Sequence, residues 1–161
     1  MGKLLETGDR ELKVAVVEAL TAIGSPAAMR LLETAVEDGE RDVRIAAVKF
    51  LAARGYRNAF PRIEGAVTGN KLKGSDLTEK MAFFEAYGTL AGAAAVPLLE
   101  KMLIPKGMLS RKEDPETRAC AAMALGKIRH PDARAVLERA AQDKEALVRN
   151  AVTRALREVG G

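Results

Sequence analysis

Residues 114–126, which read DPETRACAAMALG, contain the pattern that decides the fold. In this stretch a basic residue, Arg118, is followed by small or apolar residues two, six and seven positions later. Four further segments repeat this order, and their basic residues are Lys13, Arg44, Lys80 and Arg149. Positions at these offsets lie on one side of a helix. Each of the five segments therefore predicts a helix that buries one face.

The five basic residues recur at a regular spacing of 31, 36, 38 and 31 residues. The two longer intervals contain the insertions Gly69–Gly74 and Pro105–Pro115, and without them the period is about 31 throughout. A second periodic stretch follows in each of the first four units, with a glutamate at the same offset: Glu33, Glu64, Glu100 and Glu138. Gly and Pro separate the two stretches, as they do between helices. Each unit is thus predicted to be a helix, a turn and a second helix.

Helical hairpins of this size account for nearly the whole chain. We expect an all-α fold, an α-solenoid of about four hairpins plus a terminal helix, because one hairpin cannot bury its apolar face alone. The predicted repeats cover residues 9–38, 41–69, 76–104 and 114–143, and a closing helix covers 146–159, all in one array over 1–161. Residues 4–6 fall in register with residues 35–37, so we expect the chain to start inside a truncated repeat of a longer array or larger protein.

The composition favours the same fold. Hydrophobic residues make up 48% of the chain but aromatic residues only 4%, so the apolar content is mostly Ala, Leu and Val, which suit closely packed helices. Cys120 is the only cysteine, which excludes an intramolecular disulfide and a zinc cluster and fits a reducing compartment. The sequence shows no leader peptide and no apolar run of about 18 residues. We therefore expect a cytoplasmic protein.

Two segments, DVRIAAV at 42–48 and the stretch at 114–126, resemble the bacterial HEAT and HEAT-like repeat family, which includes the phycobilin-lyase type. In that family an acidic residue and Val-Arg open the first helix, and Ala-x-x-Ala-Leu-Gly closes it. The resemblance covers residues 9–160. It implies a scaffold that holds a partner, although three branches of this architecture are catalytic.

The residues argue against each catalytic branch. Deoxyhypusine hydroxylase-like members hold two irons with His-Glu pairs, whereas this chain has one histidine, His130, followed by a proline. Alkyl-base DNA glycosylase-like members surround the base with aromatic residues that include Trp, which is absent here. A lyase-like thiol would have to be Cys120, which stands in a column otherwise held by alanine, so a buried side chain is favoured. We therefore expect no enzyme, no catalytic residue, no cofactor and no metal.

Two surfaces are candidates for binding. The insertions both follow a second helix and are expected to meet at one edge, where they place basic and apolar side chains: Lys71, Lys73, Lys106, Met108, Leu109, Arg111 and Lys112. The glutamate column is expected to be exposed on the second helices, as an acidic stripe of Glu33, Glu64, Glu100 and Glu138. Arg62 stands where the other units have Leu or Val, so it marks a local shift or reaches a surface cleft.

These features favour a non-enzymatic protein–protein interaction scaffold with a preformed curved surface. The alternative is nucleic-acid binding through the basic loop edge. The first 40 residues carry four Lys or Arg and eight Asp or Glu, whereas the remainder carries 22 and 14, which permits an anionic partner. For the repeated basic column, however, we favour ion pairs between successive repeats over a ladder of phosphate contacts.

Overall fold

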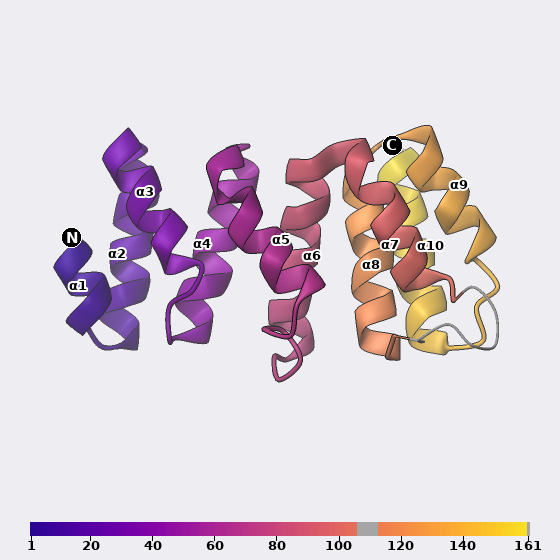
Figure 1. Ribbon diagram of the computed structural model, residues 1–161, viewed down its shortest axis with the longest axis horizontal. Coiled ribbons are helices and arrows are strands. Elements are labelled where there is room, and N and C mark those ends of the chain that lie inside the picture. The colour runs from indigo at the N-terminus through magenta and orange to yellow at the C-terminus, as the bar shows by residue number, and fades with distance from the viewer. Residues whose placement is uncertain (106–112, 161) are drawn as a thin grey trace.

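In the computed structural model, which describes residues 1–105 and 113–160, the chain is a row of stacked helical hairpins (Figure 1). The first helices of the hairpins are α2 (Arg10–Ile23), α4 (Arg41–Ala53), α6 (Leu77–Ala91) and α8 (Pro115–Lys127). The second helices are α3 (Pro26–Ala35), α5 (Phe60–Thr68), α7 (Val96–Leu103) and α9 (Pro131–Arg139). A short helix α1 (Gly2–Thr7) packs on α2, and α10 (Ala146–Gly160) follows α9.

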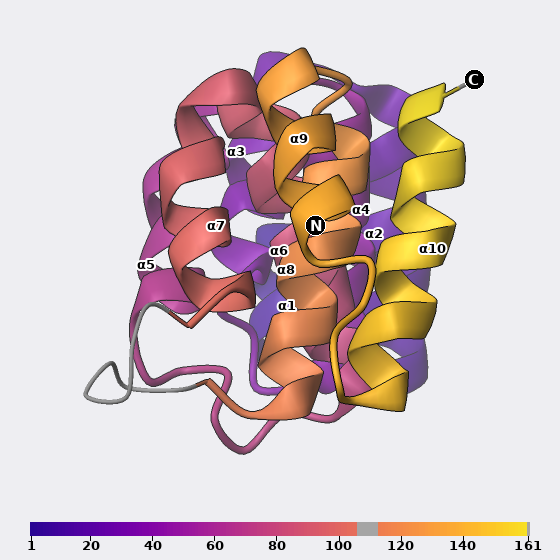
Figure 2. The ribbon, with the colours of Figure 1, turned by 90° about the vertical axis from the view of Figure 1, so that its right-hand side faces the viewer.

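The helices form two layers. The first helices and α10 pack side by side in sequence order, and this layer holds the largest contacts of the array. The second helices lie on one side of that layer, where α5 packs on α6 and α7 packs on α8 (Figure 2). Short 3-10 turns, η1 (Arg57–Ala59) and η2 (Gly92–Ala95), lead into α5 and α7. Each second helix therefore rests on the first helix of the following hairpin, which couples neighbouring repeats.

Local sequence explains where the helices begin. The side chains of Asp9, Ser25, Asp76 and Asp114 accept hydrogen bonds from backbone N–H groups in the first turns of α2, α3, α6 and α8. Such N-caps satisfy donors that have no partner inside the helix. His130 caps α9 in the same way, accepting from the N–H of Asp132 at 3.2 Å. His130 therefore lies at a helix N-terminus.

The repeated apolar columns form one continuous core. Leu20, Leu51 and Leu125, at equivalent positions of three first helices, are at most 2% exposed. Small residues allow the first helices to approach closely. A Cβ atom at Gly88 of α6 would lie 2.5 Å from the carbonyl oxygen of Ala124 in α8, so only glycine fits there without a shift. The described residues form no strand, and the prediction of an all-α solenoid is confirmed.

One segment, Leu77–Leu103, is long and apolar enough to cross a membrane by length and composition alone. This corrects the expectation that the chain has no such stretch. The segment comprises α6, η2 and α7, and 56% of its most apolar window is buried inside the stack. Its apolar residues pack against the neighbouring helices, as the core helices of a water-soluble repeat also do.

Candidate functional site

The basic column at the starts of the first helices links the repeats. Lys13 pairs with Asp38 at 3.1 Å, Arg44 with Glu79 of the next repeat at 2.6 Å, and Lys80 with Glu116 of the next repeat at 2.8 Å. Each of these cations already has a carboxylate partner, and their side chains are at most 24% exposed. The predicted pairing between successive repeats is thus observed for Arg44 and Lys80, whereas Lys13 pairs with the end of its own repeat.

The last two residues of the basic column also donate hydrogen bonds to backbone carbonyl groups that lie outside their own helices. Arg118 is 1% exposed, pairs with Asp143 and donates from Nε to the carbonyl of Leu103 at 3.0 Å. Arg149 donates to the carbonyl oxygens of Asp143 and Lys144 at 2.7 and 2.8 Å. Arg44 makes the same two contacts one hairpin earlier, with the carbonyls of residues 38 and 39. Arg44 and Arg149 therefore hold the turns before α4 and α10.

The four column glutamates lie on the four second helices, and three of them pair with arginines. Glu33 accepts from Arg62 at 3.3 Å, and Glu100 accepts from Arg139 at 3.2 Å, so both pairs join successive second helices. Glu138 pairs with Arg134 on its own helix at 2.9 Å, and Glu64 lies near the buried Tyr87, whose pKa is raised first by burial and further by this carboxylate. The column is therefore a mixed-charge surface rather than a bare acidic stripe. A role for it in binding stays a prediction.

Arg62 stands at a position that is apolar in the other units, and its side chain pairs with carboxylates of the preceding hairpin. Its guanidinium contacts Glu33 and also Glu37, which follows α3. Lys71, in the first insertion, reaches the same Glu37 carboxylate, and its hydrogen bond lowers the pKa of Glu37 below the usual value. Two cations from the second repeat thus converge on one carboxylate of the first. The first insertion is thereby tied to the neighbouring hairpin.

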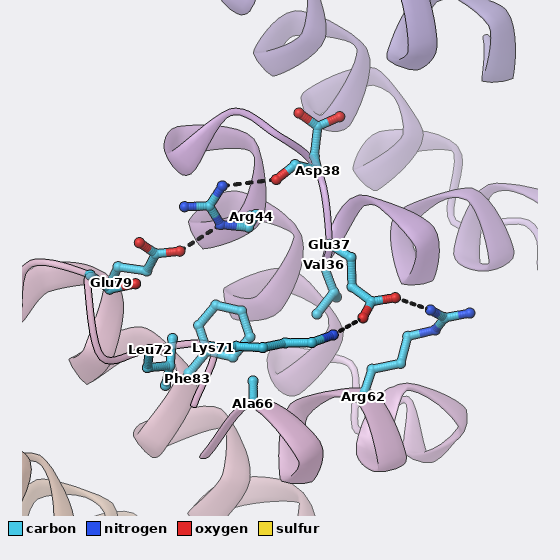
Figure 3. A pocket seen from close by; sticks show the side chains of 11 residues that line it. Val36, Glu37, Asp38, Arg44, Arg62, Ala66, Lys71, Leu72, Glu79 and Phe83 are labelled. Atoms are coloured by element: carbon cyan, nitrogen blue, oxygen red, sulfur yellow. Dashed lines mark hydrogen bonds and ion pairs between the residues drawn. The ribbon is translucent and has the colours of Figure 1, made fainter. Parts of the chain in front are cut away.

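A cavity of about 240 Å³ lies beneath this convergence (Figure 3). Lys71 extends across it, with Arg62 and Glu37 on one side and the Arg44–Glu79 pair on the other. Its apolar lining comes from three successive repeats and from the insertion: Val36, Ala66, Leu72 and Phe83. The cavity therefore offers an apolar floor under a rim of opposite charges.

A second cavity, of about 420 Å³, lies on the other side of the first insertion, and Leu72 lines both. Its polar lining includes Lys73 and Lys80, but also Glu113 and Asp114 at the start of α8. We call residues 69–75 with these two cavities the loop edge. The segment between α5 and α6 lies at the bottom of Figure 1.

Of the predicted loop residues, Lys71 and Lys73 both lie at the loop edge and are exposed. The remaining five, Lys106, Met108, Leu109, Arg111 and Lys112, lie outside the described residues. The sequence did not single out the floor residues Leu72 and Phe83 or the wall residue Glu79. A signal was present in the first insertion, where Leu72 is an apolar residue between two lysines and is only 8% exposed.

The sole thiol is unsuited to nucleophilic chemistry. Cys120 is fully buried in α8, and burial raises the pKa of its thiol to about 12. A nucleophilic cysteine requires a lowered pKa and access to solvent. Among the residues that the structure describes, no group of three or more His, Cys, Asp or Glu side chains is placed to hold a metal ion.

Comparison with known proteins defines the class. A family model of HEAT repeats matches residues 1–71 and 106–161, so the chain belongs to the HEAT repeat family. No curated protein matches the chain. One similar solved structure is human deoxyhypusine hydroxylase in complex with glycerol, at 17% sequence identity and a TM-score of 0.46, with 99% of this chain and 83% of that chain covered.

The prediction that this chain is not an enzyme is corrected by that comparison. Deoxyhypusine hydroxylase is an enzyme, so a stack of HEAT-like hairpins does not by itself exclude catalysis. The physical reason is that the fold supplies a scaffold, whereas activity depends on the side chains carried by it. The low identity and TM-score transfer no activity to this chain.

Proposed function

We propose that this HEAT-repeat scaffold binds another protein through the loop edge. The observation that carries the proposal is the first cavity, in which an apolar floor lies beneath ion pairs that face solvent. Lys71 is 62% exposed in its side chain, and Arg62 and Glu37 are 39% and 37% exposed. Exposed ion pairs contribute only about 0–1 kcal/mol, so a partner can exchange them at little cost.

The chemistry of the cavity suggests the form of the contact. An acidic side chain of the partner replaces Glu37 on Arg62 and Lys71, and an adjacent apolar side chain enters the floor beside Leu72. Burial of that side chain supplies the favourable free energy, at about 25 cal/mol per Å² of apolar area. Because the loop edge is already held by contacts between repeats, little conformational freedom is lost on binding.

Nucleic acid is the less favoured partner. Phosphate binding at several positions needs cations that are available together, whereas Lys80 is largely buried and pairs with Glu116. The second cavity also places Glu113 and Asp114 opposite its two lysines, and these carboxylates would repel phosphates.

Affinity capture from lysate of the source organism, at low and high salt, tests the proposal. The baits are the unaltered chain, a Lys71→Glu/Lys73→Glu variant, and a Lys101→Glu control on the exposed surface of α7. We expect one discrete protein that survives high salt, is lost with the double variant and is retained by the control. Nucleic acid that elutes steeply with salt would instead establish the alternative, since phosphate contacts release counterions. If the same protein is captured equally by the unaltered chain and by both variants, the loop edge is not its binding site.

A further inference from the structure

The two ends of the array carry complementary half-repeats. α10 packs on α8 as a first helix, but no second helix follows it in the described chain. α1 packs on α2, as each second helix packs on the next first helix, and its residues 4–6 are in register with residues 35–37 at the end of the first repeat. Among the described residues, α1 is therefore a second helix without a first helix. The two half-repeats lie at opposite ends of the stack, away from the loop edge (Figure 1).

The exposed side of α2 is the side on which the later first helices contact their preceding neighbour. A Cβ atom at Gly126 of α8 would lie 2.9 Å from the Cβ of Ala155 in α10, and one at Gly88 of α6 would likewise meet Ala124 of α8. Ala155 and Ala124 both stand six residues after the basic residue of their helix, and Ala19 is the equivalent residue of α2. Ala19 therefore faces away from α4, towards the end of the array.

This side of α2 has the apolar pattern of a stacking surface, yet it is exposed. Ile23 is 56% exposed, whereas Leu90 and Ile128, at the equivalent positions of α6 and α8, are 6% and 9% exposed. Leu12 is 41% exposed, whereas its equivalent in α10, Val148, is fully buried. Exposed apolar patches of this kind mark interaction sites. The shape and the apolar pattern of this side fit a further first helix.

The exposed side of α10 is basic. The side of a first helix that faces its following neighbour is marked by Gly88 and Gly126, which stand eight residues after the basic residue of their helices. In α10 this position holds Arg157, which is exposed and forms no ion pair with the described residues. Arg154, one turn earlier, is 74% exposed in its side chain. α10 thus presents two arginines at its end of the array, which faces the viewer in Figure 2.

The exposed side of α2 is acidic beside Ala15. A hollow of about 310 Å³ there is lined by one cation, Arg10, and by three carboxylates: Glu11, Glu18 and Asp42. Arg10 pairs with Asp42, so Glu11 and Glu18 leave the hollow with a net negative charge. The arginines of α10 complement this charge, whereas a second α2 at this place would bring like charges together.

We propose that copies of this chain associate head to tail, with α10 of one copy packed on the exposed side of α2 of the next. In this arrangement α10 of the first copy and α1 of the second form one composite hairpin, and the stack continues across the boundary. Arg157 then lies opposite Ala19, a pair no bulkier than Thr21 and Phe50, which hold these positions in α2 and α4. The contact joins two different surfaces, so each added copy leaves a free end and the assembly grows with concentration.

Sedimentation velocity of the full chain, from about 10 μM to 1 mM, measures this growth. Two exposed positions allow each end to be blocked separately. Ala15→Arg places a bulky cation on α2, and Arg157→Glu places a carboxylate on α10. The matched controls are Ala53→Arg, at an exposed position of α4 inside the array, and Lys101→Glu on the exposed surface of α7. Circular dichroism verifies that all variants are folded.

We expect the average mass of the unaltered chain and of both controls to rise with concentration beyond that of a dimer. Each blocked variant alone should stay monomeric, with an association constant lowered about tenfold or more, because its altered end meets a like charge. An equimolar mixture of the two blocked variants should form a dimer and nothing larger, since one intact α10 meets one intact α2. A monomeric unaltered chain, a dimer that persists in Arg157→Glu, or a mixture that stays monomeric would each overturn the proposal.

Discussion

Replacement of Arg118 by methionine is expected to destabilise the C-terminal repeats by about 3 kcal/mol. The guanidinium is 1% exposed, and it joins the carbonyl of Leu103 at the end of α7 to the Asp143 carboxylate before α10. Removal of one partner of a buried ion pair costs about 3–5 kcal/mol, because the other charge keeps its desolvation penalty. Asp143 is 15% exposed and still accepts from the N–H of Glu145 at 3.0 Å, which places the cost at the lower end. The melting temperature should then fall by about 6–12 °C.

Urea unfolding followed by circular dichroism measures this loss, and hydrogen exchange of the α8 and α9 amides localises it, since repeat arrays unfold in parts. A double-mutant cycle with Asp143→Asn should give a coupling energy of about 2 kcal/mol. The control is Arg134→Met, which removes an exposed pair with Glu138 on the same helix and should cost less than about 0.5 kcal/mol. A loss below about 1 kcal/mol for Arg118→Met, or no coupling to Asp143, would refute the reasoning.

Three further predictions follow from the packing and the charges. Gly88→Ala should cost about 1–3 kcal/mol in urea unfolding, because its Cβ would lie 2.5 Å from a backbone oxygen of α8. Gly65→Ala, whose Cβ meets nothing within 4 Å, should instead stabilise by about 0.5–1 kcal/mol, and equal effects would contradict this account. The pKa of Asp76 is lowered from 3.8 to about 2, first by its hydrogen bond with Arg41, so its stabilisation is present above pH 3.8 and is lost as the pH falls towards 2. Asp76→Asn should flatten this part of the acid unfolding curve, and an unchanged curve would count against the pairing. The Cys120 thiol should react with iodoacetamide at about pH 8 only as fast as the protein opens, and immediate labelling of the native chain would show that it is accessible.

The fold could be predicted from the sequence because the first helix of every unit must bury one apolar face. Leu20, Leu51 and Leu125 stand at one offset, and the structure buries all three in one core. The repeated basic column was also interpretable, because a cation that recurs near an acidic residue at one repeat's distance can pair across the stack. Lys80 and Glu116 are such a pair, 36 residues apart.

The binding surfaces were less accessible, because they depend on which side chains of different repeats meet. Periodicity predicts that Glu33 is exposed but does not predict that Arg62, 29 residues later, lies against it. The loop edge was predicted from the basic and apolar residues of the two insertions. Its apolar floor instead includes Leu72 of the first insertion and Phe83 of α6, which periodicity did not bring together.

The sequence by itself determined the helical hairpin, the period of the stack, the buried columns and the membership of a repeat family. These are properties of local propensity and apolar periodicity, which every unit repeats along the chain. Only the tertiary structure decided which charges are neutralised and which stand without a partner. Ion pairing depends on distances of a few Å between side chains that the sequence separates by about one repeat, and small shifts between stacked helices set those distances. For that reason Lys71 pairs with Glu37 across the repeat boundary, a contact that no periodic pattern predicts.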